Sequence, residues 1–127
     1  MPLVRISVPQ TTTTRDIAAV TDAVHHALVT HCTVPPADKF HLVQRHAPEE
    51  LICTPEFLGV KHTSHVVMVQ IFLSAGRSLE AKKALYARIA QQIADTSGFA
   101  AGDVIITLSE TTRDNWSFGN GIAQYAV

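Results

Sequence analysis

The chain has 127 residues and a mass of 13.8 kDa, a size that suits one domain. Hydrophobic residues make up 46% of the sequence and charged residues 17%, which argues against disorder. The formal net charge of −1 lacks the basic bias expected of a general nucleic-acid-binding protein. Two cysteines are too few for a disulfide framework, so we expect a reduced, cytoplasmic protein.

The N-terminal and apolar segments give no sign of export or membrane insertion. Residues 1–5 lack the basic-then-apolar layout of a signal peptide. The longest apolar stretch, 66–73, is far shorter than the ~20 residues that span a bilayer. We therefore expect neither a membrane nor a nucleic acid as partner.

The first half of the chain predicts a strand, a helix and a strand. Apolar and more polar residues alternate over 3–8, which is typical of a strand. Thr13 can cap a helix, with Asp16 three residues later, and apolar residues then recur at helical spacing. The two prolines 35–36 should end this helix, and 40–44 is the next predicted strand.

The second half repeats this order after a long connection over 47–64, which could contain short strand pieces. The run 66–73 predicts the strongest strand, with apolar residues on both faces as in a central parallel strand. A helix capped by Ser78 and a buried strand over 104–108 follow. A tail rich in turn-forming residues begins at Thr111.

The two halves also align in sequence. A fixed offset of 65 positions places Asp38 over Asp103 and Thr12 over Arg77. We interpret residues 1–127 as one domain with pseudo-repeats over about 2–46 and 66–110 and a C-terminal arm over 111–127.

This order predicts an α/β (α+β) fold of two tandem βαβ units, each with a right-handed crossover. The units would form a four-stranded mixed sheet with both helices on one face. Because the strands look apolar on both faces, the other face should also be covered. Self-association is the simplest way to cover it.

Pro2 is the first candidate for chemistry. Aminopeptidases remove an initiator Met before a small residue, so the mature chain would begin with the secondary amine of Pro2. An α-amine titrates near ~8, and burial lowers that value, so Pro2 could act as an acid or a base near neutral pH. Proline at this position is also common without any catalytic role.

Four segments support a resemblance to a known family. They are Met-Pro-Leu at 1–3, Val-Pro-Pro-Ala-Asp-Lys-Phe at 34–40, Ala-Gly-Arg-Ser at 75–78 and Asp-Asn-Trp-Ser-Phe-Gly at 114–119. With the doubled βαβ pattern, they make the chain resemble the tautomerase superfamily, and within it the malonate semialdehyde decarboxylase-like branch. The resemblance implies a homotrimer in which three sheets face a central channel, and an enzyme that needs no cofactor.

The resemblance also implies roles for five residues. Pro2 would be the acid/base group, and Asp38 would act near the proline or on water. Arg77 would hold a substrate carboxylate, for which a guanidinium is well suited. Trp116 and Phe118 would form an apolar wall that shields the pocket. The predicted activity is keto–enol tautomerisation of small 2-oxo acids.

One position departs from the family pattern and keeps alternatives open. The best-known decarboxylases have a second arginine two residues before the one matched to Arg77, and here that position is Ala75. Decarboxylation of malonate semialdehyde by a cationic Pro2, or a hydratase-type reaction, remains the alternative. A third possibility is a non-catalytic trimeric binding module that retains Met1.

Each candidate also has a purely structural interpretation. Asp38 could be a turn or cap residue, as Asp103 could be in the other half. Arg77 precedes a helix N-terminus, which disfavours a positive charge and therefore hints at an anionic partner. Trp116 and Phe118 could serve in packing or at an interface.

The seven histidines do not form a recognisable metal motif. His25 and His26 are adjacent and point to different helix faces, whereas paired helical ligands prefer i, i+4 spacing. We expect no metal, and we expect His25 to serve mainly in helix packing.

Overall fold

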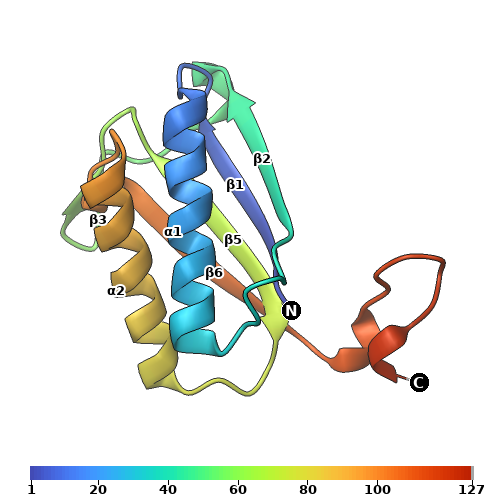
Figure 1. The fold of residues 1–127 in the computed structure, drawn as a ribbon. Helices are drawn as coiled ribbons and strands as arrows, with labels where there is room; N and C mark the ends of the chain where they lie inside the picture. The colour runs from blue at the N-terminus through green and yellow to red at the C-terminus, as the bar shows by residue number, and fades with distance from the viewer. Residues whose placement is uncertain (127) are drawn as a thin grey trace.

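The computed structural model describes residues 1–126, and a four-stranded sheet is its centre (Figure 1). The strand order is β2-β1-β5-β6. β1 (Leu3–Pro9) is parallel to β2 (His41–His46) and antiparallel to β5 (Val67–Ser74), which is parallel to β6 (Val104–Thr111). Two βαβ units therefore meet through an antiparallel pair of central strands, as the predicted mixed sheet requires.

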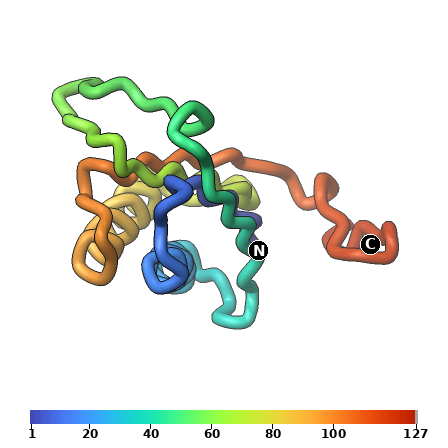
Figure 2. Tube along the Cα trace, turned by 90° about the horizontal axis from the view of Figure 1, so that it is seen from above, coloured from blue at the N-terminus to red at the C-terminus, as the bar shows by residue number. Residues whose placement is uncertain are grey.

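Two helices cover one face of this sheet. α1 (Thr14–Cys32) and α2 (Leu79–Thr96) lie side by side on the same face, as Figures 1 and 2 show. The predicted caps are confirmed. Thr13 and Ser78 each accept a hydrogen bond at 3.1 Å from the backbone N–H three residues later, which satisfies a donor that the helix leaves unpaired.

The hydrophobic core lies between the helices and the sheet. It consists of the inward residues of the central strands and the inward stripes of both helices. Its fully buried members include Val4, Ile6, Val8, Val20, Leu28, Val67, Ile71, Leu73, Leu85, Ile89 and Ile93. Burial of such side chains contributes roughly 1.5–3 kcal/mol each to folding.

The second face of the sheet is more polar than the sequence indicated. A row of paired residues crosses its middle from Leu42 through Arg5 and Gln70 to Thr107. The prediction of strands apolar on both faces is therefore wrong at this row. β5 is central, as expected, but it is antiparallel to β1 rather than parallel to both neighbours.

The strand β2 and the long connection after it differ from the predictions mainly in their boundaries. β2 extends to His46, beyond the predicted 40–44. The long connection begins with a 3-10 turn, η1 (Pro48–Glu50), and contains the short hairpin of β3 (Glu56–Phe57) and β4 (Val60–Lys61). Leu58 and Gly59 take positive φ values of 49° and 82° at the tip of this hairpin, where the chain reverses.

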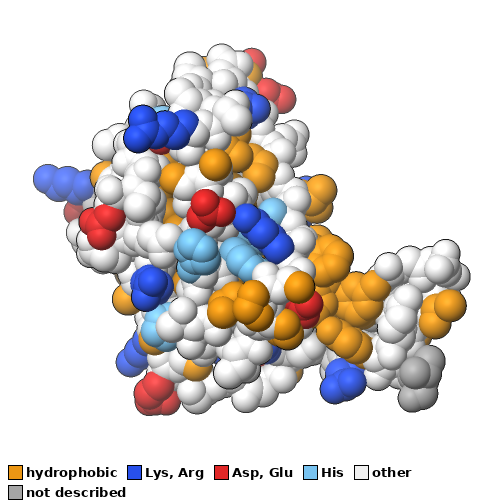
Figure 3. All heavy atoms as spheres, in the orientation of Figure 1, with side chains coloured by type: hydrophobic (Ala, Val, Ile, Leu, Met, Phe, Trp, Pro, Cys, Tyr) orange, Lys and Arg blue, Asp and Glu red, His pale blue; other side chains and the backbone are white. Residues whose placement is uncertain are grey.

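A 3-10 turn, η2 (Ala101–Asp103), leads into β6, and the chain after β6 forms an arm that extends away from the sheet (Figures 1 and 2). The arm contains two further 3-10 turns, η3 (Arg113–Asn115) and η4 (Gln124–Ala126). Hydrophobic side chains gather where it joins the body of the molecule (Figure 3). Among residues 1–126, neither long helix has the run of apolar residues that a membrane crossing would need.

Candidate active site

The N-terminus lies at the edge of the sheet where β5 ends and the C-terminal arm begins (Figure 1). Pro2 is buried there, and Leu3 pairs with Phe72 of β5. Burial lowers the pKa of the terminal amine of the full-length chain below its ordinary value of 8.0. The carboxylate of Asp38 opposes this shift and the guanidinium of Arg77 adds to it, so both charges act on the amine.

Asp38 lies in the loop between α1 and β2. Its backbone N–H donates to the carbonyl oxygen of Pro35 at 2.9 Å, which closes a turn. The side chain is half-buried and accepts no hydrogen bond from any of residues 1–126. The carboxylate is therefore available to a substrate, a water or the amine.

Asp103, which the repeat aligns with Asp38, lies in a different environment. It is 3% exposed and accepts hydrogen bonds from the backbone N–H of Thr63 at 2.8 Å and from its hydroxyl at 2.6 Å. Its oxygens hold the segment before β5 in place. Both aspartates therefore lie in turns, but within residues 1–126 only the carboxylate of Asp103 is used in structural hydrogen bonds.

Arg77 bonds to three backbone positions through its guanidinium group. Nε and Nη2 donate to the carbonyl oxygen of Cys32 at 3.3 and 3.1 Å, and Nη1 donates to that of Ser74 at 2.7 Å. Cys32 is the last residue of α1, so the charge lies where a helix C-terminus favours a cation. This corrects the sequence-based view of Arg77 as placed against a helix dipole. Two of its five N–H groups remain for another acceptor.

The arm forms one side of a pocket beside the N-terminus. Leu3, Arg5, Leu42, Phe72 and Trp116 line this cavity of about 260 Å³. The indole N–H of Trp116 donates to the hydroxyl of Thr111 at 2.7 Å.

Phe118 lies next to Trp116 and extends the aromatic surface of the arm. Its ring stacks on Trp116 with centroids 5.5 Å apart, and it lies 6.2 Å from the ring of Phe40, just before β2. Contacts of this kind dock the arm against the loop that contains Asp38.

These contacts bring the five predicted residues to one end of the sheet. Asp38 and Arg77 act on the terminal amine, and the aromatic pair lies next to Leu3 and Phe40. The sequence analysis missed Arg5, which adds a positive charge to the pocket. The only sequence signal for it was its place on the more polar side of the first strand.

The opposite end of the sheet repeats one of these hydrogen bonds with a neutral side chain in place of Arg77. The hydroxyl of Thr12 donates to the carbonyl oxygen of Pro9 at 2.7 Å, as Nη1 of Arg77 does to Ser74. Thr12 is neutral and 4% exposed. Within residues 1–126, no three His, Cys, Asp or Glu side chains gather closely enough to hold a metal ion.

Comparisons with known proteins identify the family. The family model described as tautomerase enzyme matches residues 38–119. The probable tautomerase YusQ of Bacillus subtilis (strain 168) is 31% identical over 124 residues, which cover 98% of each chain.

Two solved structures extend the similarity to the whole fold. The malonate semialdehyde decarboxylase FG41, inhibited by 3-bromopropiolate, superposes with a TM-score of 0.89 at 36% identity, over 97% of this chain and 93% of that one. The fused 4-OT protein Q0, a symmetric trimer, superposes with a TM-score of 0.77 at 25% identity, over 98% of both chains. The resemblance read from the sequence is thereby confirmed: the chain belongs to the tautomerase family and is an enzyme of its malonate semialdehyde decarboxylase-like branch.

Proposed function

We propose that this protein is a cofactor-independent keto–enol tautomerase of small 2-oxo acids, with the amine of Pro2 as its acid/base group. The observation that supports this most directly is the electrostatic setting of the terminal amine. Burial and Arg77 both lower its pKa, which favours the neutral base at neutral pH. Removal of Met1 would transfer this setting to the secondary amine of Pro2.

In the proposed reaction, the two remaining N–H groups of Arg77 bind the substrate carboxylate. Neutral Pro2 accepts the proton of the enol hydroxyl and returns a proton to the adjacent carbon, so the ketone forms with no net gain or loss of protons. Asp38 stabilises the protonated amine between these steps. Trp116 and Phe118 keep water from the pocket, which strengthens the charge interactions inside it.

We propose that the working form is a homotrimer. The row from Leu42 to Thr107 crosses the sheet face opposite the helices, and Leu42 is 55% exposed there. Association of copies through this face would exclude water from the neighbouring pocket. The symmetric trimer of the similar Q0 protein supports this arrangement.

Decarboxylation of a 3-oxo acid such as malonate semialdehyde is the second candidate, and a hydratase-type reaction is related to it. One observation favours this class: the charge of Asp38 opposes the net lowering of the amine's pKa, and a cationic amine would polarise the substrate carbonyl while carbon dioxide leaves. The similarity to a malonate semialdehyde decarboxylase points the same way. The two candidates differ in the charge of Pro2 at neutral pH.

Ultraviolet-monitored ketonisation of phenylenolpyruvate tests the proposal, on protein whose N-terminus is checked by intact mass. We expect Pro2→Ala to lower kcat/KM at least 100-fold. Pro9→Ala, the same change at the far end of β1, should have little effect. A rate that needs the neutral amine excludes the decarboxylase mechanism. If wild type and Pro2→Ala are equally slow, tautomerisation by proline is wrong, and malonate semialdehyde should be assayed. A retained Met1 would instead indicate a binding module.

A further inference from the structure

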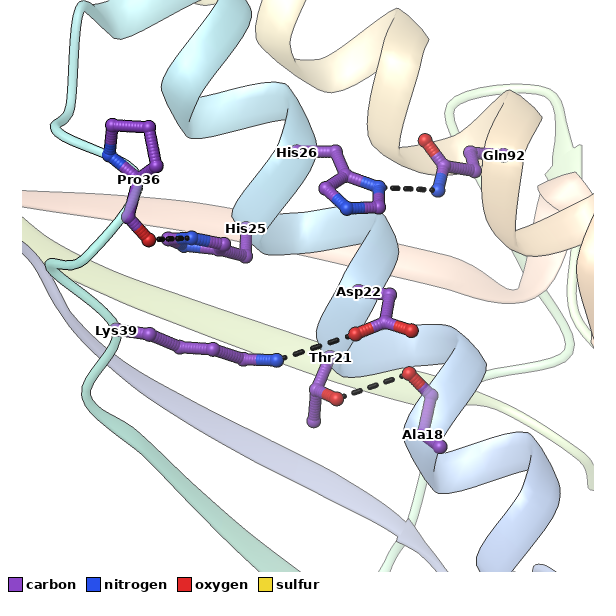
Figure 4. Close-up of polar contacts among 8 residues, drawn as sticks. All are labelled: Ala18, Thr21, Asp22, His25, His26, Pro36, Lys39 and Gln92. Carbon is purple, nitrogen blue, oxygen red and sulfur yellow. Dashed lines mark hydrogen bonds and ion pairs between the residues drawn. The ribbon is translucent and has the colours of Figure 1, made fainter.

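We infer that His25 is a positioning residue for Asp38, because it fixes the segment on which that carboxylate lies. The inference rests on the proposed function, in which Asp38 acts on the Pro2 amine. His25 lies on α1, and its Nε2 is 2.8 Å from the carbonyl oxygen of Pro36 (Figure 4).

The hydrogen-bond partner of Nε2 determines which ring nitrogen of His25 carries a proton. A carbonyl oxygen can only accept, so Nε2 of His25 must be the donor. In the neutral ring, Nδ1 is then unprotonated, and it finds no partner within residues 1–126. His25 is 9% exposed and Pro36 is exposed, so the bond between them is partly shielded from competing water.

Between the buried Val34, whose N–H donates to the carbonyl oxygen of Leu28 at 3.3 Å, and Asp38, the segment has few other attachments. Pro35 and Pro36 have no backbone N–H, so this stretch can bind the body of the protein mainly through its carbonyl groups. After Asp38, the backbone N–H of Val4 donates to the carbonyl oxygen of Phe40 at 2.9 Å. Asp38 therefore lies two residues from a fixed point on either side, and His25 provides the one that precedes it.

A second side-chain contact on this segment is weaker. Nζ of Lys39 lies 3.3 Å from Oδ1 of Asp22, one turn before His25 on α1 (Figure 4). Both side chains are substantially exposed, and exposed ion pairs contribute little. Figure 3 shows acidic, basic and histidine side chains side by side on this face. Of the two side-chain hydrogen bonds that tie this segment to α1, the one from His25 is therefore the stronger.

His26 provides a matched control on the next position of the same helix. It is exposed, and its Nδ1 lies 3.2 Å from Nε2 of Gln92 on α2, away from the Asp38 loop (Figure 4). Replacement of either histidine by Phe removes a ring hydrogen bond and keeps an aromatic ring. Only His25→Phe releases the carbonyl of Pro36.

The test is a double-mutant cycle on kcat and KM with phenylenolpyruvate. We expect His25→Phe to lower kcat roughly 10-fold with little change in KM, since a displaced catalytic group slows the chemical step. His26→Phe should leave both constants within twofold of wild type. His25→Gln retains an N–H donor at similar reach and should restore most of the lost rate. In an Asp38→Asn background, His25→Phe should cause no further loss.

The outcomes distinguish a failure of the positioning role of His25 from a failure of the role of Asp38. Two results would overturn the positioning role and leave the proposed function standing, provided that Asp38→Asn slows the enzyme. One is a kcat for His25→Phe equal to that of His26→Phe. The other is a double variant in which the losses in kcat from Asp38→Asn and His25→Phe multiply. If Asp38→Asn has no effect, the role of Asp38 falls, and the role of His25 falls with it. Should His25→Phe not fold, ¹⁵N NMR of wild-type rings decides, because a proton on Nδ1 rather than Nε2 of His25 would contradict the inference.

Discussion

The guanidinium of Arg77, just before α2, donates two hydrogen bonds to the carbonyl oxygen of Cys32 at the end of α1, at 3.3 and 3.1 Å. The proposed substrate ligand is thus also a link between the two βαβ units. Its position is set before any substrate binds, because the backbone of the other unit holds it. A change at this residue should therefore affect both stability and substrate affinity.

Arg77→Lys tests this double role. Lysine retains the charge but cannot bind an acceptor with two N–H groups in a fixed fork. We expect a loss of about 1–2 kcal/mol in the free energy of unfolding and roughly a 10-fold rise in KM for a carboxylate substrate. Urea denaturation and steady-state kinetics measure the two effects. Arg88→Lys, an exposed change on α2, is the control. An unchanged KM would argue against a carboxylate at Arg77.

Replacement by alanine should affect activity at Asp38 and stability at Asp103. Asp103→Ala removes the two hydrogen bonds that this buried carboxylate accepts from the N–H and hydroxyl of Thr63, so unfolding should become easier by about 1–3 kcal/mol. Turnover by the remaining folded protein should be preserved. Asp38→Ala should lower kcat and leave the urea midpoint nearly unchanged, because its carboxylate binds no side chain or backbone N–H of residues 1–126. The reverse pattern would contradict our assignment of the two residues.

The two cysteines should differ in reactivity. Cys32 is 3% exposed, and burial raises the pKa of its thiol above 9.0, although Arg77 partly opposes this shift. The thiolate is the reactive form, so iodoacetamide at pH 8 should modify half-buried Cys53 first. Intact-mass analysis should show one adduct on native protein and two in urea. In Cys53→Ser, rapid modification of the native protein would show that Cys32 is more accessible than its burial implies.

His41 should make the protein less stable in mild acid. Burial, with the charge of Lys39, lowers the pKa of the folded-state imidazole to about 4 from 6.5. Between these values the unfolded chain binds a proton that the folded chain does not, so stability is complete above pH 6.5 and falls as the pH drops towards 4. After allowance for solvent screening, the loss is about 2 kcal/mol.

Urea denaturation at pH 7 and pH 4.5, at constant protein concentration, measures this loss. In the described part of the chain both ring nitrogens of His41 are buried without a hydrogen-bond partner. His41→Leu therefore loses no hydrogen bond and should flatten the pH dependence, whereas His26→Leu should not. Equal pH dependence in wild type and His41→Leu would show that another group is responsible.

Local signals in the sequence predicted the elements, and a resemblance over the whole chain predicted the fold. The caps at Thr13 and Ser78 could be found because each depends on a hydrogen bond to a residue only three positions away. The mixed sheet followed from the repeated order of strand, helix and strand. The exposed face was misjudged because the apolar run of β5 concealed the polar row through Arg5 and Gln70.

The finer structure of the site depends on contacts that span long stretches of chain. Arg77 and Cys32 are 45 residues apart, and no periodicity links them. The bond from His25 to Pro36 joins a helix to the loop after it, so the sequence analysis could assign His25 only to helix packing. Side-chain partners of this kind depend on how the elements dock, which hydrophobic pattern alone does not determine.

The repeated hydrogen bonds of Arg77 and Thr12 have a consequence for how such a chain can evolve. The two ends of the sheet share one of these hydrogen bonds, but one end presents charges and the other binds Asp103 to Thr63. Mutations that tighten the second end can accumulate with little effect on turnover. Stability can therefore be adjusted at the Thr12 end, away from the proposed pocket, even though Arg77 contributes to both stability and substrate binding at the other end.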